Sequence, residues 1–392
     1  MAENEIVPLE KKLEKLSPKL RSMIRTQAER DHEIDDMLSF CKSYRGETGG
    51  IITDFLGRTM LHCNAGATLE TAFWLKKHLD NGGKLVITVA GALSSFQIGI
   101  LLSELINQGK VHLISATGAN HEESYYRFVA HSYYGYIANY PELTPEQEVE
   151  LRDAELRRIT DTFLPELESV RLLEPPVTEM IREEGKKIQV INDPELGIML
   201  EGGRHFPSEY FRRLLTDDLI KGDPAGKPEC CWTLAAQQKG IPIIVPGFED
   251  STMGNIISSY TYAGPHKRAD LGRLNPFAIK TGLEYMHELY DWYMKNSQDS
   301  KIAFLQLGGG ISADFPICVV PSLKHDNMLE NVRDWAGFIE INTSHMSQGS
   351  YTGAGGKEKM TWDKLSVDSF YKIIQSDVTL AFPLIAAVLL GK

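Results

Sequence analysis

The chain lacks the sequence patterns that mark several common protein classes. Its 5 cysteines show no Cys-x-x-Cys spacing, so we expect reduced thiols and neither a disulfide framework nor a structural zinc site. Its 11 histidines show no His-Glu-x-x-His spacing, so we expect no metal. Neither the Gly-x-Gly-x-x-Gly fingerprint nor the phosphate-binding loop of nucleotide-binding proteins occurs. The ordinary dinucleotide motifs are therefore no guide to function here.

Positive charge and long hydrophobic runs are also scarce. The formal net charge of −12 disfavours nucleic acid as a partner and suits cationic small molecules, although many acidic proteins bind none. The longest apolar run, Leu380 to Leu390, is too short to span a bilayer and contains Pro383. The charged N-terminus lacks the apolar region of a signal peptide. We therefore expect a cytoplasmic protein that binds no nucleic acid and no membrane.

Hydrophobic residues make up 42% of the 392 residues, which is enough for a large core. Short apolar, β-branched runs alternate with helical stretches, one of which covers residues 96–108. The expected strands cover residues 84–90, 110–117, 241–247, 301–310 and 337–343. This alternation predicts an α/β fold with a Rossmann-like, mainly parallel sheet flanked by helices.

The N-terminal part differs from the rest in composition. Residues 10–44 carry Lys, Glu, Arg and Leu at helical spacing, which predicts one or two surface helices. We therefore expect an N-terminal helical extension at residues 1–45 and one α/β domain at residues 46–392. Residues 141–224 predict a charged, helical excursion of that domain, because strand signals are few there.

Four of the expected strands end in small or polar residues. The strand ends are residues 90–95, 115–123, 247–255 and 308–310. Because ligands bind at the carboxyl ends of parallel strands, these segments predict a binding edge. Taken alone, each segment also fits a helix cap or a tight turn.

Residues 341–365 combine a Gly-Ser turn, a glycine-rich loop, an acid, an indole and an amine. A run of small residues lets the backbone approach a ligand closely. Glu358, Trp362 and Lys364 follow that run and are suited to hold and attack a cationic compound. Alone, Lys364 would be interpreted as a solvated helix lysine.

These segments together resemble, in the same order, the motifs of deoxyhypusine synthases. The Ser-Trp-Gly-Lys signature of that family, whose lysine carries the substrate as an imine, is matched by Thr361-Trp362-Asp363-Lys364. The four strand ends match family loops, and Asp377-Val378-Thr379 matches the family's Asp-Ala-Ser. The resemblance covers most of the chain from about residue 49 to residue 390 and is weakest over residues 141–227.

The resemblance implies site residues in three roles. The expected catalytic residues are Lys364, Trp362 and Glu123. The residues expected to bind NAD are Ser94, Ser95, Ala116, Thr117, Gly118, Glu123, Asp250, Gly309, Thr343, Asp377 and Val378. The residues expected to bind the substrate are Glu122, Glu123, Asn255, Asp314, Gly349, Ser350, Tyr351, Glu358 and Trp362.

Three family positions that contact the polyamine are altered in this chain. Ala313-Asp314 stands where the family has Lys-His, Asn255 replaces an acid, and Tyr351 replaces an aspartate. The cofactor positions are largely kept. The resemblance therefore implies the same redox chemistry with an altered substrate.

In the reaction that the resemblance implies, NAD oxidises a carbon next to an amine of spermidine and later returns the hydride. Lys364 would displace the departing amine and hold the aminobutyl group as an imine until an acceptor amine replaces it. Trp362 would lie against the alkyl chain, and Glu122, Glu123 and Glu358 would anchor amines and relay protons.

Three readings of the function stay open. The altered pocket favours a small acceptor amine such as putrescine, which gives homospermidine-type synthesis. The alternative acceptor is a lysine of translation initiation factor 5A. A catalytically silent NAD-binding protein is the third reading, and the retained Lys364 and Trp362 argue against it. The resemblance also implies a homotetramer with sites at subunit contacts.

Overall fold

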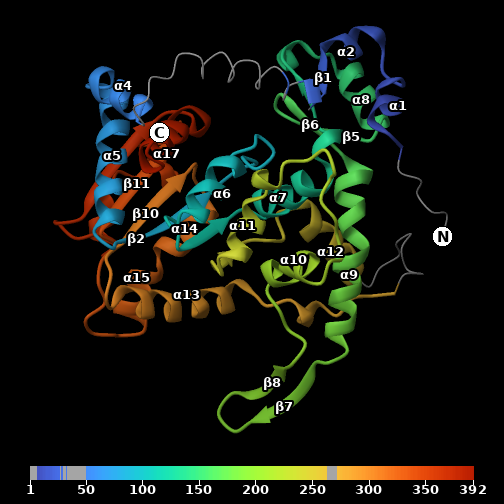
Figure 1. The fold of residues 1–392 in the computed structure, drawn as a ribbon. Helices are drawn as coiled ribbons and strands as arrows, with labels where there is room; N and C mark the ends of the chain where they lie inside the picture. The colour runs from blue at the N-terminus through green and yellow to red at the C-terminus, as the bar shows by residue number, and fades with distance from the viewer. Residues whose placement is uncertain (1–6, 27, 30–31, 33–49, 263–271) are drawn as a thin grey trace.

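The computed structural model describes residues 7–26, 28–29, 32, 50–262 and 272–392 (Figure 1). Six parallel strands form the central sheet in the spatial order β12-β11-β10-β2-β3-β9. Their bounds are β2 Lys84–Val89, β3 Leu113–Ala116, β9 Ile243–Ile244, β10 Ile302–Leu307, β11 Gly337–Asn342 and β12 Phe370–Gln375. The predicted α/β fold with a mainly parallel sheet is confirmed.

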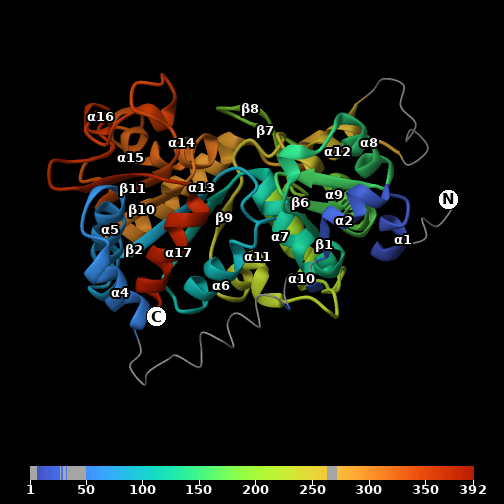
Figure 2. The ribbon, with the colours of Figure 1, turned by 90° about the horizontal axis from the view of Figure 1, so that it is seen from above.

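Helices cover both faces of this sheet (Figures 1 and 2). On one face, α5, α6, α11 and α17 bury the odd-numbered residues of β2, such as Leu85 and Ile87. On the other face, the even-numbered Val86 packs among helices that include α7, α12, α13 and α14. Burial on both faces explains why these strands are continuous apolar runs in the sequence.

The helices are short to medium in length. Their bounds are α1 Leu9–Leu13, α2 Pro18–Met23, α4 Ile51–Thr59, α5 Cys63–Asp80, α6 Gly99–Asn107, α7 Gly118–Ala130, α8 Pro145–Asp153, α9 Arg171–Gly185, α10 Pro207–Thr216, α11 Trp232–Gln238, α12 Thr252–Thr261, α13 Gly282–Ser297, α14 Ile311–Ile317, α15 Val319–Pro321, α16 Glu358–Thr361 and α17 Val378–Leu389. Among the residues that the structure describes, none of these helices is long and apolar enough to cross a bilayer.

A second, antiparallel sheet lies beside the central one. It has the order β1-β4-β6-β5, with bounds β1 Ile24–Thr26, β4 Gly135–Ile137, β5 Leu156–Ile159 and β6 Thr162–Pro165. A separate hairpin, β7 Gln189–Asp193 with β8 Gly197–Glu201, projects from the body of the protein (Figure 1). The helical pattern predicted for residues 141–224 is confirmed by α8, α9 and α10, but the four strands β5 to β8 also lie there. Each of these strands has only four or five residues, so their strand pattern in the sequence is weak.

The N-terminal segment is more than a surface extension. Helices α1 and α2 form as predicted, but Leu9, Leu13 and Leu20 are buried against the second sheet. Strand β1 then pairs antiparallel with β4, and Ile24 lies opposite Ile137. The expectation of helices on the surface is wrong in this respect. The predicted domain boundary at residue 45 lies outside the described residues and stays a prediction.

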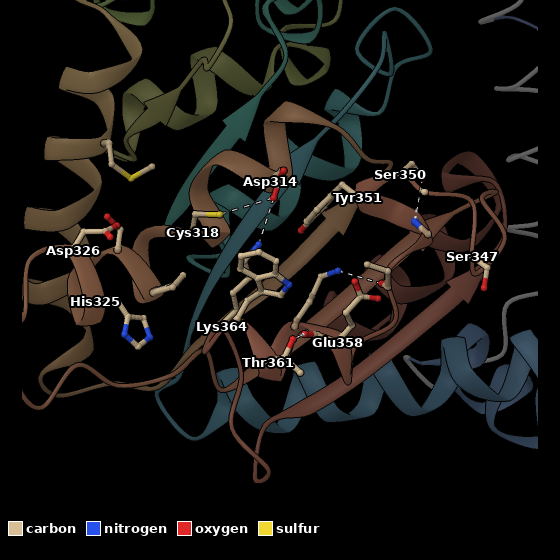
Figure 3. A pocket seen from close by; sticks show the side chains of 18 residues that line it. Asp314, Cys318, His325, Asp326, Ser347, Ser350, Tyr351, Glu358, Thr361 and Lys364 are labelled. Carbon is tan, nitrogen blue, oxygen red and sulfur yellow. Dashed lines mark hydrogen bonds and ion pairs between the residues drawn. The ribbon is translucent and has the colours of Figure 1, made fainter.

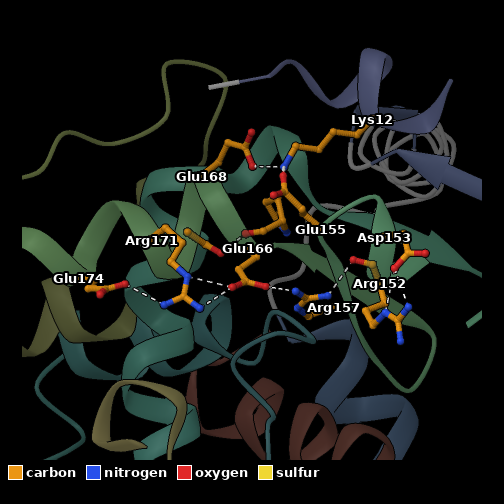
Figure 4. Close-up of polar contacts among 11 residues, drawn as sticks. Lys12, Arg152, Asp153, Glu155, Arg157, Glu166, Glu168, Arg171 and Glu174 are labelled. Carbon is orange, nitrogen blue, oxygen red and sulfur yellow. Dashed lines mark hydrogen bonds and ion pairs between the residues drawn. The ribbon is translucent and has the colours of Figure 1, made fainter. Parts of the chain in front are cut away.

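A buried ion pair fixes α1 to the helical turn Glu166–Val170 that precedes α9 (Figure 4). Lys12 Nζ lies 2.7 Å from Glu168 Oε2, and both side chains are almost fully buried. Next to this pair, Arg171 bridges Glu166 and Glu174 with nitrogen–oxygen distances of 2.6 and 2.8 Å. Removing one partner of a buried pair leaves a buried charge without compensation, so this contact is important for docking the N-terminal segment.

Candidate functional site

The order of the central sheet identifies a binding edge. Numbered by their appearance in the chain, the strands follow the order 3-2-1-4-5-6, and the direction of winding reverses between β2 and β10. In such sheets the crevice outside the carboxyl ends at the reversal receives the ligand. The segments that follow β2 and β10 begin at Ala90 and Gly308, respectively.

Glycines line this reversal point in backbone conformations that other residues rarely adopt. Gly91, Gly308 and Gly310 have φ angles of 65°, 80° and 82°. A Cβ atom at Gly308 would lie only 2.9 Å from Ala90 Cβ. Backbone without side chains at a topological switch is what a dinucleotide needs for close approach. The residues of this edge therefore fit a dinucleotide, although the usual glycine fingerprint is absent.

The residues expected to bind NAD are distributed along this carboxyl edge. Ala116 ends β3 and is followed by Thr117 and Gly118; Asp250 follows β9, Gly309 follows β10, Thr343 follows β11, and Asp377 and Val378 follow β12. Several of them also have structural contacts. Thr117 Oγ1 donates a hydrogen bond to the carbonyl of Gly91 at 2.8 Å, and Asp377 caps α17. A Cβ atom at Gly309 would collide with the side chain of Thr352. Their role in cofactor binding stays a prediction.

Ser94 and Ser95 are buried in the loop after β2. Ser94 Oγ donates to the carbonyl of Asn120 at 2.8 Å and accepts a hydrogen bond from Trp232 Nε1 at 2.9 Å. The backbone N–H of Ser95 donates to Glu123 Oε2 at 3.1 Å. These contacts connect the loop after β2 to α7 and α11. In this conformation both serines have a structural role.

A cavity of about 880 Å³, called the glutamate pocket here, lies between α7, α12 and the second sheet. Its lining includes the predicted site residues Glu122, Glu123, Asp250 and Asn255. Arg157 and Arg171, which the sequence did not single out, contribute to the same wall.

The two glutamates of this pocket are buried acids with raised pKa values. Desolvation raises the pKa of Glu122 to about 7, against hydrogen bonds from the backbone N–H groups of Thr252 and Met253 at the start of α12. Desolvation and the neighbouring Glu122 raise the pKa of Glu123 to about 8. Acids that titrate near neutrality can both donate and accept protons. The pocket is therefore suited to proton transfer.

A second cavity, of about 1160 Å³, is called the lysine pocket (Figure 3). It collects the predicted residues from the C-terminal segment and from α14. These residues are Asp314, Gly349, Ser350, Tyr351, Glu358, Trp362 and Lys364. The structure thus brings together the acid Glu358, the indole and the amine of the segment 341–365, and adds Asp314 from α14.

Lys364 lies in the wall of the lysine pocket and is largely shielded from solvent. Its side chain is 11% exposed, and Nζ lies 3.5 Å from Asp314 Oδ1. The ring centre of Tyr351 is 5.6 Å from the same nitrogen. Trp362, by contrast, is 66% exposed at the rim. A shielded amine with a nearby carboxylate is a plausible nucleophile, and the exposed indole leaves a large apolar surface uncovered.

The backbone of the residue before Lys364 shows why glycine suits that position of the Ser-Trp-Gly-Lys signature. Asp363 has a φ angle of 54°, a left-handed conformation in which glycine is favoured and aspartate is tolerated. Its carboxylate accepts from Lys324 Nζ at 3.0 Å and lies 3.1 Å from His325 Nε2. These ion pairs hold the conformation that a glycine would adopt at less cost.

Sequence reasoning missed two buried charged residues beside this pocket. Lys359 is 2% exposed and contributes to the pocket lining, while Glu340 of β11 is fully buried and interacts electrostatically with Lys359. Burial lowers the pKa of Lys359 and raises that of Glu340 to about 7. The signal for Glu340 was a lone acid within the apolar run 337–343. Lys359 carried no such signal, because it stands among other charged residues.

The predicted substrate residues are divided between the two cavities. Asp314 and Tyr351 line the lysine pocket, whereas Asn255 lines the glutamate pocket. The two cavities share none of their lining residues. Within one copy of the chain, the structure does not bring the complete set together.

Comparison with known proteins decides the family. A model of the deoxyhypusine synthase family matches residues 58–389. The chain belongs to the deoxyhypusine synthase family. A relative named "Probable deoxyhypusine synthase" from Sulfurisphaera tokodaii is 26% identical over 292 residues, which cover 74% of this chain and 77% of that protein. A deoxyhypusine synthase-like protein from Chlorobaculum tepidum is 21% identical over 309 residues, covering 78% of this chain and 76% of the relative.

The solved structures include more distant matches. A structure described as that of "a putative deoxyhypusine synthase from Entamoeba histolytica" is 12% identical, covers 83% of this chain and 87% of that chain, and has a TM-score of 0.45. Membership of the family makes the chain a transferase of aminobutyl groups, and the reaction of the family depends on NAD. The prediction of an enzyme of this family is confirmed.

Proposed function

We propose that this chain transfers an aminoalkyl group from a polyamine to a small acceptor amine through an imine of Lys364. The observation that carries the proposal is the position of Lys364 in the pocket wall, 11% exposed and 3.5 Å from Asp314. A carboxylate at that distance is suited to take the proton that the amine must lose before it attacks.

NAD, when bound, would take a hydride from the substrate carbon next to an amine and return it at the end of the cycle. The loops after β2, β10 and β3, with Gly91, Gly308 and Gly118, would hold it at the reversal point of the sheet. The nitrogen of Lys364 would add to the oxidised carbon while the original amine leaves with a proton. The acceptor amine would then add to the same carbon and release Lys364 unchanged.

The lining of the lysine pocket supports a small acceptor. Tyr351 stands where the family has an aspartate, and its phenol ring lies 5.6 Å from Lys364 Nζ. An aromatic ring can hold an alkylammonium through its face, but it offers no carboxylate. We therefore favour a diamine such as putrescine, which makes homospermidine-type synthesis the proposed outcome.

We further propose that the complete site forms between subunits of a homotetramer. The family assigns Asn255, Asp314 and Tyr351 to one ligand, yet these residues lie in two pockets that share no lining residue. The exposed indole of Trp362 also favours a partner surface over the lysine pocket. If the lysine pocket of one subunit faced the glutamate pocket of another, Asn255, Asp314 and Tyr351 would line one shared site.

The acceptor is tested by incubating the enzyme with NAD⁺ and single amines (putrescine, spermidine or agmatine), followed by identification of the products by mass. Homospermidine-type products support the proposal. Labelling of initiation factor 5A without any small-amine product would overturn the acceptor and leave the chemistry standing. NAD binding without any turnover would favour the catalytically silent reading.

The shared site is tested by complementation. Lys364→Ala and Glu123→Gln subunits are each expected to be inactive, and their mixed oligomers are expected to regain part of the activity. A monomer in analytical ultracentrifugation, or no recovery in mixed oligomers, would contradict the shared site.

A further inference from the structure

Lys359 is a buried amine with an unusual set of neighbours. Its Nζ lies 4.5 Å from the ring centre of Phe338 and 4.5 Å from that of Tyr351. Its hydrogen bond within the described part of the chain goes to the carbonyl of Ala354 at 3.3 Å. Two aromatic rings and a carbonyl oxygen around one nitrogen form the arrangement by which proteins recognise ammonium ligands.

A buried acid completes this arrangement from below. Glu340 lies two residues from Phe338 on β11, so both side chains point to the same face of the sheet. Glu340 Oε1 accepts from Asn342 Nδ2 at 2.5 Å, while Glu340 Oε2 and the hydroxyl of Tyr351 are buried without a partner among the described residues. Buried polar atoms normally have partners, so these atoms indicate a binding position for a polar or charged group.

The same ring connects this position to the nucleophile. The ring centre of Tyr351 lies 4.5 Å from Lys359 Nζ and 5.6 Å from Lys364 Nζ. Both amines line the lysine pocket. A ligand bound next to Lys364 therefore also lies near the ammonium group between Phe338 and Tyr351.

We propose that Phe338, Tyr351 and Glu340 form an ammonium cage, and that Lys359 fills it with its own amine. Lys359 is then a specificity-determining residue. While Lys359 occupies the cage, a substrate cannot place an ammonium group there. The pocket therefore accepts a substrate with one ammonium group fewer than it would accept without Lys359. This inference rests on the proposed function only for its effect on substrates; the cage itself is independent of transfer.

The charge of the neighbours agrees with an ammonium at this position. Burial lowers the pKa of Lys359, while the carboxyl groups of Glu340, Asp314 and Glu358 oppose that shift and Lys364 adds to it. An acid beneath the cage therefore favours the protonated amine, whether it belongs to Lys359 or to a ligand.

The cage is tested without catalysis by chemical rescue. Lys359→Ala removes the side chain beyond Cβ, and n-propylammonium replaces the missing carbons and nitrogen. We expect a saturable rise in the melting temperature of Lys359→Ala with n-propylammonium, and none with n-propanol or in the wild-type protein, because a ligand that binds only the folded state stabilises it. Equal responses to the amine and the alcohol, or no response, would overturn the cage.

The effect on specificity is tested with a diamine and a triamine as donors. Lys359→Ala should raise kcat/KM for the triamine relative to the diamine about tenfold, since the emptied cage accepts the extra ammonium. Lys359→Met, which keeps most of the volume but no charge, should give an intermediate ratio and serves if the alanine variant does not fold. An unchanged ratio in both variants, or an equal loss for both substrates, would show that Lys359 is only structural.

The two tests separate the cage from the proposed function. Rescue by n-propylammonium with no transfer from any amine would refute the proposed function and leave the cage. Transfer to a small amine with no rescue and no change in the substrate ratio would refute the cage and leave the proposed function.

Discussion

The glutamate pocket and the lysine pocket place charged groups by different means. In the glutamate pocket, Glu122 accepts hydrogen bonds from two backbone N–H groups at the start of α12, and Glu123 accepts one from Ser95. In the lysine pocket, Lys364 follows the short helix α16, and the carboxylate of its ion-pair partner Asp314 is 3.5 Å away. The first pocket is held by regular backbone, whereas the second depends on side chains.

This difference agrees with where the chain departs from its family. Two of the three altered positions, Asp314 and Tyr351, line the lysine pocket, and the buried Lys359 lies there as well. Asp314, Tyr351 and Lys359 lie in short helical segments, namely α14, the turn Tyr351–Gly353 and α16, and line the pocket. A side chain that lines a pocket can be exchanged while the backbone hydrogen bonds of its segment stay in place. We infer that the lysine pocket sets the substrate, while the glutamate pocket is tied to the stability of the fold.

The largest expected effect is on catalysis in the lysine pocket. Lys364→Ala should lower turnover by at least about a thousandfold, because it removes the proposed nucleophile, while NAD binding and the melting temperature stay close to wild type. Steady-state kinetics and calorimetry with NAD measure the two properties. Substantial turnover by Lys364→Ala would show that the amine exchange proceeds without a covalent imine.

The next effect is on stability in the glutamate pocket. Glu123→Ala should lower the free energy of unfolding by about 1–3 kcal/mol, because the buried N–H of Ser95 loses its acceptor. Glu123→Gln keeps an acceptor and should lower it less. Glu358→Ala, at an exposed acid of the lysine pocket, is the matched control and should change it by less than about 0.5 kcal/mol. Urea unfolding measures all three, and a larger loss from Glu358→Ala would reverse the comparison.

A smaller effect is a dependence of stability on pH. Glu122 and Glu123 have folded pKa values of about 7 and about 8, above the ordinary value of 4.5 for glutamate. The folded state therefore binds more protons, so this stabilisation is complete below pH 4.5 and is lost as the pH rises through 7 and 8.

We expect the melting temperature to fall between about pH 5 and about pH 9, and the fall to be smaller when both glutamates are replaced by glutamine. Glu340 of the lysine pocket, with a pKa raised to about 7, should account for part of the remaining slope. A steeper slope in the double glutamine variant would contradict the assignment.

The smallest effect concerns the backbone beside Lys364. Asp363→Ala loses the contacts with Lys324 and His325 and keeps the left-handed φ of 54°, whereas Asp363→Gly loses the same contacts but relieves the backbone. The glycine variant should therefore be more stable than the alanine variant by about 1 kcal/mol. Thermal unfolding of the pair measures the difference, and equal stability would mean that the loop adopts another conformation.

The sequence predicts best where burial imposes a continuous pattern. Strands β2, β10 and β11 lie within the predicted ranges, because both of their faces are buried and most of their residues are apolar. Strand β12 was missed: it lies at the sheet edge, is only partly buried and includes Lys372. The partly buried β12 and the short antiparallel strands therefore lack the continuous buried run by which the central strands are detected.

The part of the candidate site whose residues are close together in the sequence was predictable. Glu358, Trp362 and Lys364 are close in sequence and line one pocket. The cage was not predictable, because Phe338, Tyr351 and Lys359 come together only through the packing of the loop after β11 on the sheet. The burial of Leu9 and Leu13 under the second sheet was hidden for the same reason, since the partner strands follow more than a hundred residues later.

The central claim is that Lys364 carries the transferred group as an imine. Borohydride added during turnover with NAD⁺ and a polyamine should reduce that imine and leave a mass increment on Lys364 and on no other lysine, Lys359 included. Peptide mass spectrometry locates the increment. An increment on another lysine, or none despite product formation, would contradict the account and reduce Lys364 to an electrostatic role.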